Sequence, residues 1–233
     1  MIEGNAILEA LEESIQKEGL EETVFIVRSN KRANLYNQQI RHRILFLEEE
    51  LSVGDQLMVV KNNYFWLAPE SVPGFIANGD LIKIIRILDH KEIYGFSFAK
   101  VEVAMVDYPD EKQFETMLLL DTLSSESSSL SFEEGNKLYH AVNEDYQHLT
   151  TKYKRFMAVK NDPYFNALQV KYSYAITCHK SQGGQWKKVF VEQPYLPDGP
   201  SVAYFRWLYT AITRAKEQLY LIGFGKEYFP TED

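Results

Sequence analysis

The chain has 233 residues, of which 45% are hydrophobic and 25% are charged. These values exclude wholesale disorder, and at this length they predict one large domain or one domain with an insert. The single cysteine, Cys178, excludes an intrachain disulfide and favours a reducing compartment, for which we expect the cytoplasm. No window of 18 consecutive residues is apolar, so we expect no membrane partner.

Charge is distributed unevenly along the chain. The net charge is −8, which by itself argues against a nucleic-acid ligand. Residues 28–43 nevertheless hold five Arg or Lys, and residues 171–191 hold four Lys, with no acid in either segment. Two acid-free segments on an otherwise acidic chain indicate a site for a polyanion. Two solvated surfaces with an accidental bias are the alternative interpretation.

The first 45 residues have the pattern of an α/β unit. Residues 5–18 place apolar side chains at helical spacing, and Gly19 is a plausible end for that helix. The β-branched run at 23–27 predicts a buried strand, and residues 30–45 predict a helix capped by Asn30. A strand followed directly by a helix is typical of an α/β domain.

A β-rich stretch begins near residue 50. Short apolar runs separated by Gly, Asn and Pro turn signals predict an antiparallel unit, which we interpret as a small barrel. The predicted strands are QLMVV after Gly54-Asp55, then 81–88, 93–98, 100–106 and 113–120. A serine-rich loop at 122–131 and a looser helical pattern from 132 to about 153 follow.

The final third returns to α/β character. We predict strands at 173–177, 187–191 and 217–222 and a helix at 201–213. The predicted fold is α/β, a mostly parallel sheet with helices on both faces, interrupted by a β-barrel insert. The α/β domain is expected to span 1–50 and 125–233, and the insert 51–124.

Two segments of the final third could carry chemistry. The segment ITCHKSQGGQW follows a predicted strand, where ligands usually bind in α/β sheets, and Gly183 and Gly184 would let backbone amides face phosphate oxygens. A polar turn is the alternative interpretation. In WLYTAITRAKEQLYLI, Arg214 at the helix end has a planar fork suited to phosphate, although a cation at a helix C-terminus also interacts with the dipole.

Other candidates are weaker. Tyr64, Phe65 and Trp66 form an aromatic cluster at the tip of the insert that could stack on bases, or could be barrel core plus one exposed ring. Cys178 is interpreted as a small buried residue. The five histidines show no zinc-ligand spacing, so we predict no metal site.

The quoted segments resemble superfamily 1 helicases. TCHKSQGGQW resembles their motif V, LYTAITRAKEQLYL their motif VI, and TVFIVRSNKRANLYNQQIR their motif IV. GDQLMVVKNNY and ANGD resemble the insert of the RecD-like and Dda-like branch, which includes the exonuclease V alpha subunit and acts in DNA repair and recombination. That branch carries a barrel of the Src-homology-3 type between motifs IV and V.

The resemblance implies roles for individual residues. Arg214 matches the arginine finger on the ATP γ-phosphate, and Arg28 matches a motif IV arginine that reaches the same phosphate. Gln185 stands where many relatives have an acid that binds the ribose, and it keeps an acceptor without the charge. The remaining expected ATP contacts are Gly183 and Thr213. The expected DNA contacts are Thr177, His179, Lys180, Ser181 and Gln182 of motif V, with Tyr64 and Trp66 of the insert.

No P-loop sequence G-x-x-x-x-G-K-[ST] is present. The resemblance therefore implies the second RecA-like domain alone, with ATP and Mg held mainly by a first domain and no ATPase activity from this chain by itself. Expected partners are single-stranded DNA, that first domain and other helicase–nuclease subunits. A stand-alone binding module for nucleic acid or protein and an RNA-directed motor are the alternatives.

Overall fold

The computed structural model describes residues 4–225 and 228–229. The chain divides into two compact units. One comprises Met1–Glu48 and Ser173–Asp233, and we call it the sheet unit. The other comprises Glu49–Tyr172, and we call it the barrel unit. Each is described by itself.

The sheet unit is built on four parallel strands in the order β7-β1-β8-β9. The bounds are β1 Thr23–Val27, β7 Ala175–Thr177, β8 Trp186–Glu192 and β9 Ala215–Ile222. Strand β1 is central and its five residues are all buried. Successive side chains of a strand point to opposite faces, so both faces of the sheet are covered. The predicted parallel sheet is confirmed.

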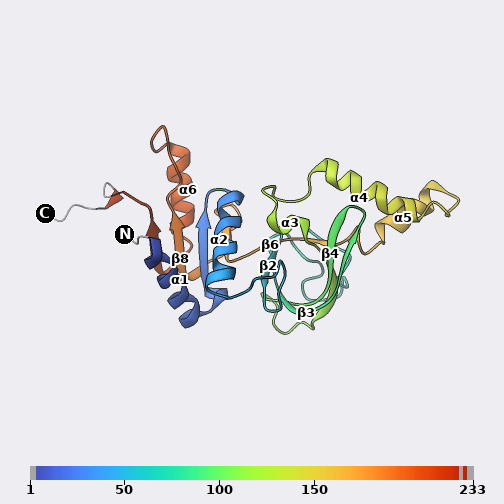
Figure 1. Cartoon of the computed structure of the whole chain (residues 1–233), viewed down its shortest axis with the longest axis horizontal. Helices are drawn as coiled ribbons and strands as arrows, with labels where there is room; N and C mark the ends of the chain where they lie inside the picture. Colours follow the sequence, from blue (N-terminus) through green and yellow to red (C-terminus); the bar gives the residue numbers. More distant parts are fainter. Residues whose placement is uncertain (1–3, 226–227, 230–233) are drawn as a thin grey trace. The chain divides into compact units, whose positions relative to one another are not determined.

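Within the described part of this unit, three α-helices and a short 3₁₀ helix accompany the sheet. They are α1 Gly4–Glu18, η1 Leu20–Glu22, α2 Asn30–Arg43 and α6 Val202–Ile212. Helices α1 and α2 contact β1, and α6 contacts β8 (Figure 1). The N-cap of α2 is Ser29, whose hydroxyl accepts the amide of Arg32, and not Asn30 as predicted. Asn30 instead begins the helix one position later.

Five strands of the barrel unit close into a barrel. They are β2 Gln56–Val59, β3 Leu81–Ile93, β4 Phe96–Met105, β5 Phe114–Leu119 and β6 Leu168–Tyr172. The pairings are antiparallel except that of β5 with β6. On β3, buried Ile82 and Ile84 alternate with more exposed residues, as expected for a strand with one face on the core.

The strand predicted at 93–98 is wrong. Ile93 pairs with Phe96, so Tyr94 and Gly95 form a two-residue hairpin loop between β3 and β4. Both loop residues have positive φ, 60° and 74°, as a type I′ turn requires. The apolar run therefore belongs to two strands that meet at this turn.

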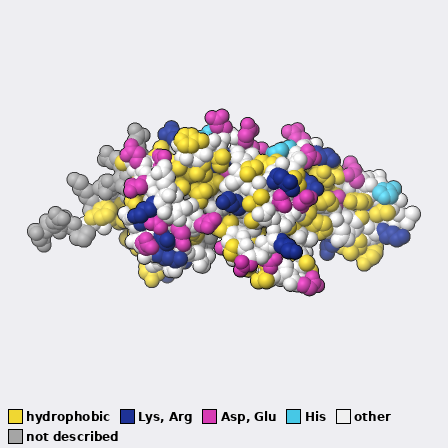
Figure 2. Space-filling model, turned by 90° about the horizontal axis from the view of Figure 1, so that it is seen from below, with side chains coloured by type: hydrophobic (Ala, Val, Ile, Leu, Met, Phe, Trp, Pro, Cys, Tyr) yellow, Lys and Arg dark blue, Asp and Glu magenta, His cyan; other side chains and the backbone are white. Residues whose placement is uncertain are grey.

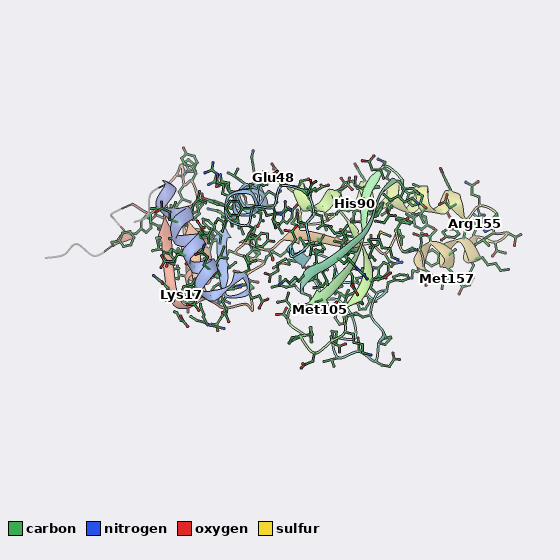
Figure 3. The ribbon with its side chains drawn as sticks, turned by 60° about the horizontal axis from the view of Figure 1, so that its bottom comes forward. Lys17, Glu48, His90, Met105, Arg155 and Met157 are labelled. Carbon is green, nitrogen blue, oxygen red and sulfur yellow. The ribbon has the colours of Figure 1, made fainter. Side chains whose placement is uncertain are left out.

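Helices α4 Phe132–Asp145 and α5 Lys152–Lys160 replace the single helix predicted from 132 to 153, and a short α3 spans Asp121–Ser124. Leu138 and Val142 of α4 and Val159 of α5 share a core cluster with barrel residues such as Phe98. The two helices lie side by side, and Figure 3 shows Arg155 and Met157 on α5. The compact unit thus extends to Tyr172, beyond the expected end of the insert at 124.

Candidate nucleotide and nucleic-acid site

The motif V loop, residues 178–185, connects the carboxyl end of β7 to the amino end of β8. Three of its backbone amides donate to carbonyls of Thr177 and Ser181. The amides of Lys180 and Ser181 donate to the Thr177 carbonyl at 2.8 and 3.2 Å, and that of Gly184 donates to the Ser181 carbonyl at 3.1 Å. The expectation that the glycine turn presents its amides to phosphate is therefore wrong for these three, which already have acceptors.

The side chains of this loop divide into two groups. His179 and Gln182 are exposed, and Lys180 is half-buried, which lowers the pKa of its ammonium. Ser181 is fully buried and its hydroxyl donates to the Cys178 carbonyl at 2.8 Å. Ser181 thus shapes the turn, while His179, Lys180 and Gln182 are accessible to a ligand. Thr177 is half-buried at the end of β7.

Arg214 ties helix α6 to the motif V loop. Its guanidinium donates to the carbonyls of Thr210 and Gly184 at 3.0 and 3.2 Å and to the Thr213 hydroxyl at 3.1 Å. The Trp186 amide in turn donates to the Arg214 carbonyl at 3.0 Å. Among the described residues Arg214 forms no ion pair. Its charge is therefore hydrogen-bonded but not neutralised.

Gly183 and Gly184 occupy positions of this loop that do not suit a residue with a side chain. Gly183 has φ +87°, a conformation that residues with a side chain rarely adopt. A Cβ at Gly184 would overlap Cη2 of Trp186, so the indole ring occupies the space that any other residue would need. The backbone of residues 183–185 is in this way held beside Arg214.

Arg28 lies beside the start of the motif V loop, because Val27 pairs with Thr177 and its carbonyl accepts the Cys178 amide at 3.1 Å, but it does not lie beside Arg214. It follows the carboxyl end of β1, and the register of β1 on β8 places it level with Gln193. Trp186, which is bonded to Arg214, lies at the amino end of β8, seven residues or roughly 23 Å away along the strand. The expectation that Arg28 lies near Arg214 is wrong, because parallel strands carry these two residues at opposite edges of the sheet.

Arg28 instead borders a hollow of about 640 Å³ at the carboxyl edge. Arg32 and Tyr36 of α2 both bond the carboxylate of Glu192 there, the tyrosine at 2.7 Å. Burial and the carboxylate raise the pKa of Tyr36 to about 12. The sequence analysis did not predict this group of Arg32, Tyr36 and Glu192. Glu192 lies 160 residues after Arg32 and 156 after Tyr36, and no motif joins it to them.

The aromatic cluster of the barrel unit is divided as well. Tyr64 is 70% exposed and stacks on Phe75 with ring centroids 4.9 Å apart. Trp66 is half-buried and packs against the barrel-unit core, and its indole N–H donates to the Asn166 carbonyl at 2.8 Å. Tyr64 can therefore meet a ligand, whereas Trp66 has a structural contact for its polar group.

Cys178 is buried as predicted, and burial raises the pKa of its thiol. Within residues 4–225 and 228–229, no cluster of three or more potential ligands for a metal ion occurs. No described helix has both the length and the hydropathy of a membrane span. On the face drawn in Figure 2, Lys and Arg side chains are interspersed with Asp and Glu instead of forming one basic patch.

The candidate loop lies in a segment that is similar to a helicase domain. Residues 172–222 match the model of the UvrD-like helicase C-terminal domain. An uncharacterized protein of Methanocaldococcus jannaschii is 41% identical over 69 residues, which are 29% of this chain and 6% of that protein.

Among solved structures, the chain is similar to the Pif1 helicase from Candida albicans, with 14% identity and a TM-score of 0.44 over 96% of this chain and 50% of that one. It is also similar to Pif1 from Bacteroides in complex with ADP-AlF3 and single-stranded DNA, with 13% identity and a TM-score of 0.44 over 97% of this chain and 51% of that one. The chain thus spans about half the length of these structures. The match over residues 172–222, which includes the motif V loop and Arg214, supports a superfamily 1 helicase C-terminal domain in this chain.

Proposed function

We propose that this chain is the second RecA-like motor domain of an ATP-dependent DNA helicase of the RecD-like branch. In this proposal its barrel unit corresponds to the Src-homology-3-type insert. The accessible motif V side chains, with Lys180 foremost, contact the backbone of single-stranded DNA. Arg214 acts on the γ-phosphate of ATP that a P-loop domain holds with Mg, so the isolated chain does not hydrolyse ATP.

The observation that carries the proposal is the meeting of two distant segments. The guanidinium of Arg214 bonds the Gly184 carbonyl, and the Arg214 carbonyl accepts the Trp186 amide, so motifs V and VI share one structure. In this proposal, a change in one segment is transmitted to the other through these two bonds. Such coupling is what a motor needs between its nucleotide site and its nucleic-acid site. Gln185 is exposed beside this junction, and its amide suits a ribose hydroxyl. The Thr213 hydroxyl already donates to the Tyr209 carbonyl at 2.9 Å, which does not support its expected contact with ATP.

A contact between Arg28 and the γ-phosphate of ATP remains a prediction. Its place at the opposite edge of the sheet does not support a shared phosphate with Arg214.

The two alternative functions, a stand-alone binding module and an RNA-directed motor, keep specific support. A stand-alone module is favoured by the absence of a P-loop sequence from these residues. An RNA-directed motor fits the same contacts, because a site that follows phosphates accepts both nucleic acids unless the 2′-OH is recognised.

The DNA contact is tested with Lys180→Ala in the protein that joins this chain to a P-loop domain. The slope of log affinity for single-stranded DNA against log salt concentration should become shallower by about 0.7, the value for one lost phosphate contact on a single strand. Affinity should fall alike for all base sequences. Fluorescence anisotropy over a series of salt concentrations gives both quantities.

Lys216→Ala is the matched control. Lys216 is an exposed lysine on β9 of the same unit and forms no ion pair within the described residues. Its loss should leave the slope unchanged. Equal slopes for the Lys180→Ala protein and the parent protein would show that Lys180 is ordinary surface charge and would remove the proposed DNA contact.

A further inference from the structure

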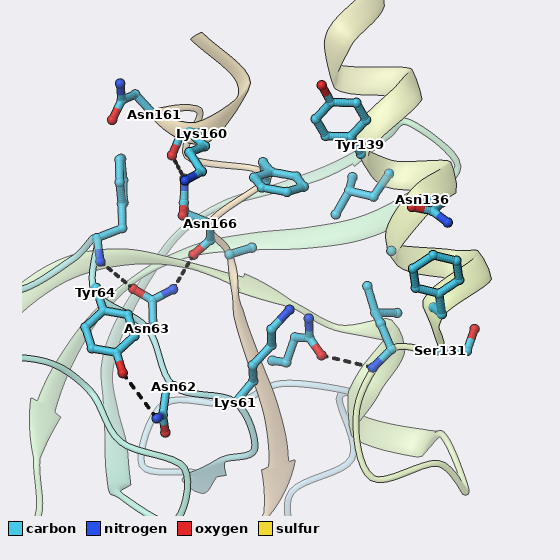
Figure 4. Close-up of a pocket in the computed structure, with 18 residues that line it drawn as sticks. Lys61, Asn62, Asn63, Tyr64, Ser131, Asn136, Tyr139, Lys160, Asn161 and Asn166 are labelled. Carbon is cyan, nitrogen blue, oxygen red and sulfur yellow. Dashed lines mark hydrogen bonds between the residues drawn. The ribbon is translucent and has the colours of Figure 1, made fainter. Parts of the chain in front are cut away.

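A cavity of about 590 Å³ lies within the barrel unit, between the loop that follows β2 and the helices α4 and α5 (Figure 4). Cavities of this size accept ligands of the size of a nucleotide. None of the residues that line it is Asp or Glu, although the chain as a whole has a net charge of −8. Its lining combines aromatic rings, amides and two lysines.

One wall of the cavity is fixed by hydrogen bonds. The Asn63 side chain accepts the Phe65 amide at 3.0 Å and donates to the Asn166 carbonyl at 2.8 Å. The Asn166 side chain donates to the carbonyls of Lys160 and Asp162 at 2.7 and 2.8 Å. These amides hold the loop and the end of α5 together, so they form a rigid wall and are not available to a ligand.

The opposite wall begins at the N-terminus of α4. Ser131 caps the helix in a capping box, in which the Glu134 carboxylate accepts the Ser131 amide at 2.8 Å. The backbone bond holds the pKa of Glu134 below its usual range. The nearby acid is therefore engaged in the cap, and the wall that faces the cavity is formed by Phe132, Asn136 and Tyr139.

Several groups of the lining have no partner within the described part of the chain. The Asn136 amide and the Tyr139 hydroxyl form no hydrogen bond with described residues, and Lys61 forms no ion pair with them. Figure 4 shows the Lys61 side chain extending toward the space between Asn63 and Asn136. Lys160 is different, because its ammonium lies 5.0 Å from the Phe156 ring centroid on its own helix.

Two large aromatic side chains of the lining are exposed. Phe132 is 84% exposed and Tyr64 is 70% exposed. They come from opposite walls, one from α4 and the other from the loop after β2. Exposed rings cost free energy in water, and a flat aromatic ligand would cover them.

We propose that this cavity binds one unstacked base of a single-stranded nucleic acid. Phe132 and Tyr64 contact the base, Asn136 hydrogen-bonds its edge, and Lys61 contacts the adjacent phosphate. An aromatic, anionic ligand fits this lining better than a peptide or a neutral metabolite, because the cavity offers rings and a cation but no carboxylate. The choice of a nucleic acid as the ligand rests on the proposed function; the position of the site does not.

The test compares two labelled oligonucleotides of about 12 nucleotides, a length within the usual range for one binding module. One is oligothymidylate, and the other has abasic residues at its centre. Fluorescence anisotropy with the full 233-residue chain should show about 5- to 100-fold weaker binding of the abasic strand. Phe132→Ala and Asn136→Ala should weaken binding of oligothymidylate and leave binding of the abasic strand unchanged.

Matched controls are available in the same unit. Tyr153→Ala removes a ring of α5 that is 72% exposed and does not line the cavity. Lys112→Ala removes an exposed lysine outside the cavity and matches Lys61→Ala. Each control variant should bind the two strands as the parent chain does, with the same preference for oligothymidylate. Oligouridylate should bind as oligothymidylate does, and thymidine monophosphate should compete only at far higher concentration.

Three results would overturn the inference. The first is equal affinity for the two strands. The second is equal effects of Phe132→Ala and Tyr153→Ala. The third is no detectable binding of either strand, since every residue that lines the cavity belongs to this chain.

A different result would remove the proposed function. If Lys180→Ala leaves the salt slope of the assembled enzyme unchanged, the proposed DNA contact is lost, whatever the cavity variants do. If only the cavity variants have no effect, the motif V contact stands and the base pocket does not exist.

Discussion

At the residue scale, the state of Arg214 is the most informative feature. Three oxygen atoms hold its guanidinium, and none belongs to a carboxylate. The bond to the Thr210 carbonyl is what a cation at the end of a helix is expected to form. The bond to the Gly184 carbonyl is not explained by a helix end, because it reaches another segment. An arginine that is oriented but not neutralised remains attractive to an anion from another domain.

The same junction makes Gly184 sensitive to a small substitution. In Gly184→Ala, the new methyl group would overlap the Trp186 ring, so the ring or the loop must move. We expect a loss of about 1–3 kcal/mol in the free energy of unfolding, as for overpacked sites. Urea denaturation followed by tryptophan fluorescence measures this loss, and the native emission of Trp186 should also change.

Gly135→Ala provides the comparison for this prediction. Gly135 lies in helix α4, and a Cβ there meets no atom within 4 Å. Alanine is favoured over glycine in a helix, so this variant should be more stable than the parent by up to about 1 kcal/mol. A Gly184→Ala protein with the parent's stability and unchanged emission would show that the Trp186 contact does not constrain the loop.

At the element scale, the parallel strands of the sheet unit were predictable. Strand β1 is a short, wholly apolar run, TVFIV, and its length and β-branched residues identify it as buried. Strand β6 was missed. It is LQVKY, which has no clear signal of its own, and its partners β2 and β5 lie about 110 and 50 residues earlier in the chain. Closure of a barrel is a property of pairing that local pattern does not reveal.

The site was predictable only in part, for the same reason. Motif spacing predicted the loop and Arg214 as candidates, because these lie in continuous segments, and the structure brings Arg214 and Gly184 of the loop together. It did not reveal that Arg28 lies at the other edge of the sheet, since that requires the strand order and register. Nor did it identify Lys61 or Asn136, which as isolated exposed polar residues have no sequence signal. Local chemistry was therefore accessible from the sequence, and the assembly of distant residues was not.

The role of β6 leads to a prediction about fragments of the barrel unit. A fragment of residues 49–172 contains all five strands and should fold cooperatively. A fragment of residues 51–124, the insert as expected from sequence, lacks β6 and leaves edges of β2 and β5 unpaired. We expect it to aggregate or remain unfolded, because open strand edges associate. Circular dichroism during heating would distinguish the two, and cooperative melting of the shorter fragment would contradict the account.

At the scale of the whole molecule, the chain crosses between its two units only near residues 48–49 and 172–173. The sheet unit contains the segment that matches the helicase family, and the barrel unit contains the cavity proposed for a base. The residues that this chain contributes to each candidate site belong to a single unit. The two functions that we assign, contact with nucleotide and strand backbone in one unit and contact with a base in the other, can therefore be removed separately.

The central claim is that Arg214 serves ATP hydrolysis in an assembled motor. An arginine that stabilises the charge of phosphoryl transfer contributes mainly in the transition state, so its loss affects turnover more than nucleotide binding. Arg206→Ala is the matched control, because Arg206 is an exposed arginine on the same helix α6. Arg214→Lys should restore activity only partly, since lysine lacks the planar fork.

The most direct measurement is the ATPase turnover, stimulated by single-stranded DNA, of the protein that joins this chain to a P-loop domain. With Arg214→Ala we predict a fall in kcat of about 10³- to 10⁵-fold and a much smaller change in the Kd for ATP. The Arg206→Ala protein should turn over at the parent rate. Turnover near the parent value in the Arg214→Ala protein would contradict the account.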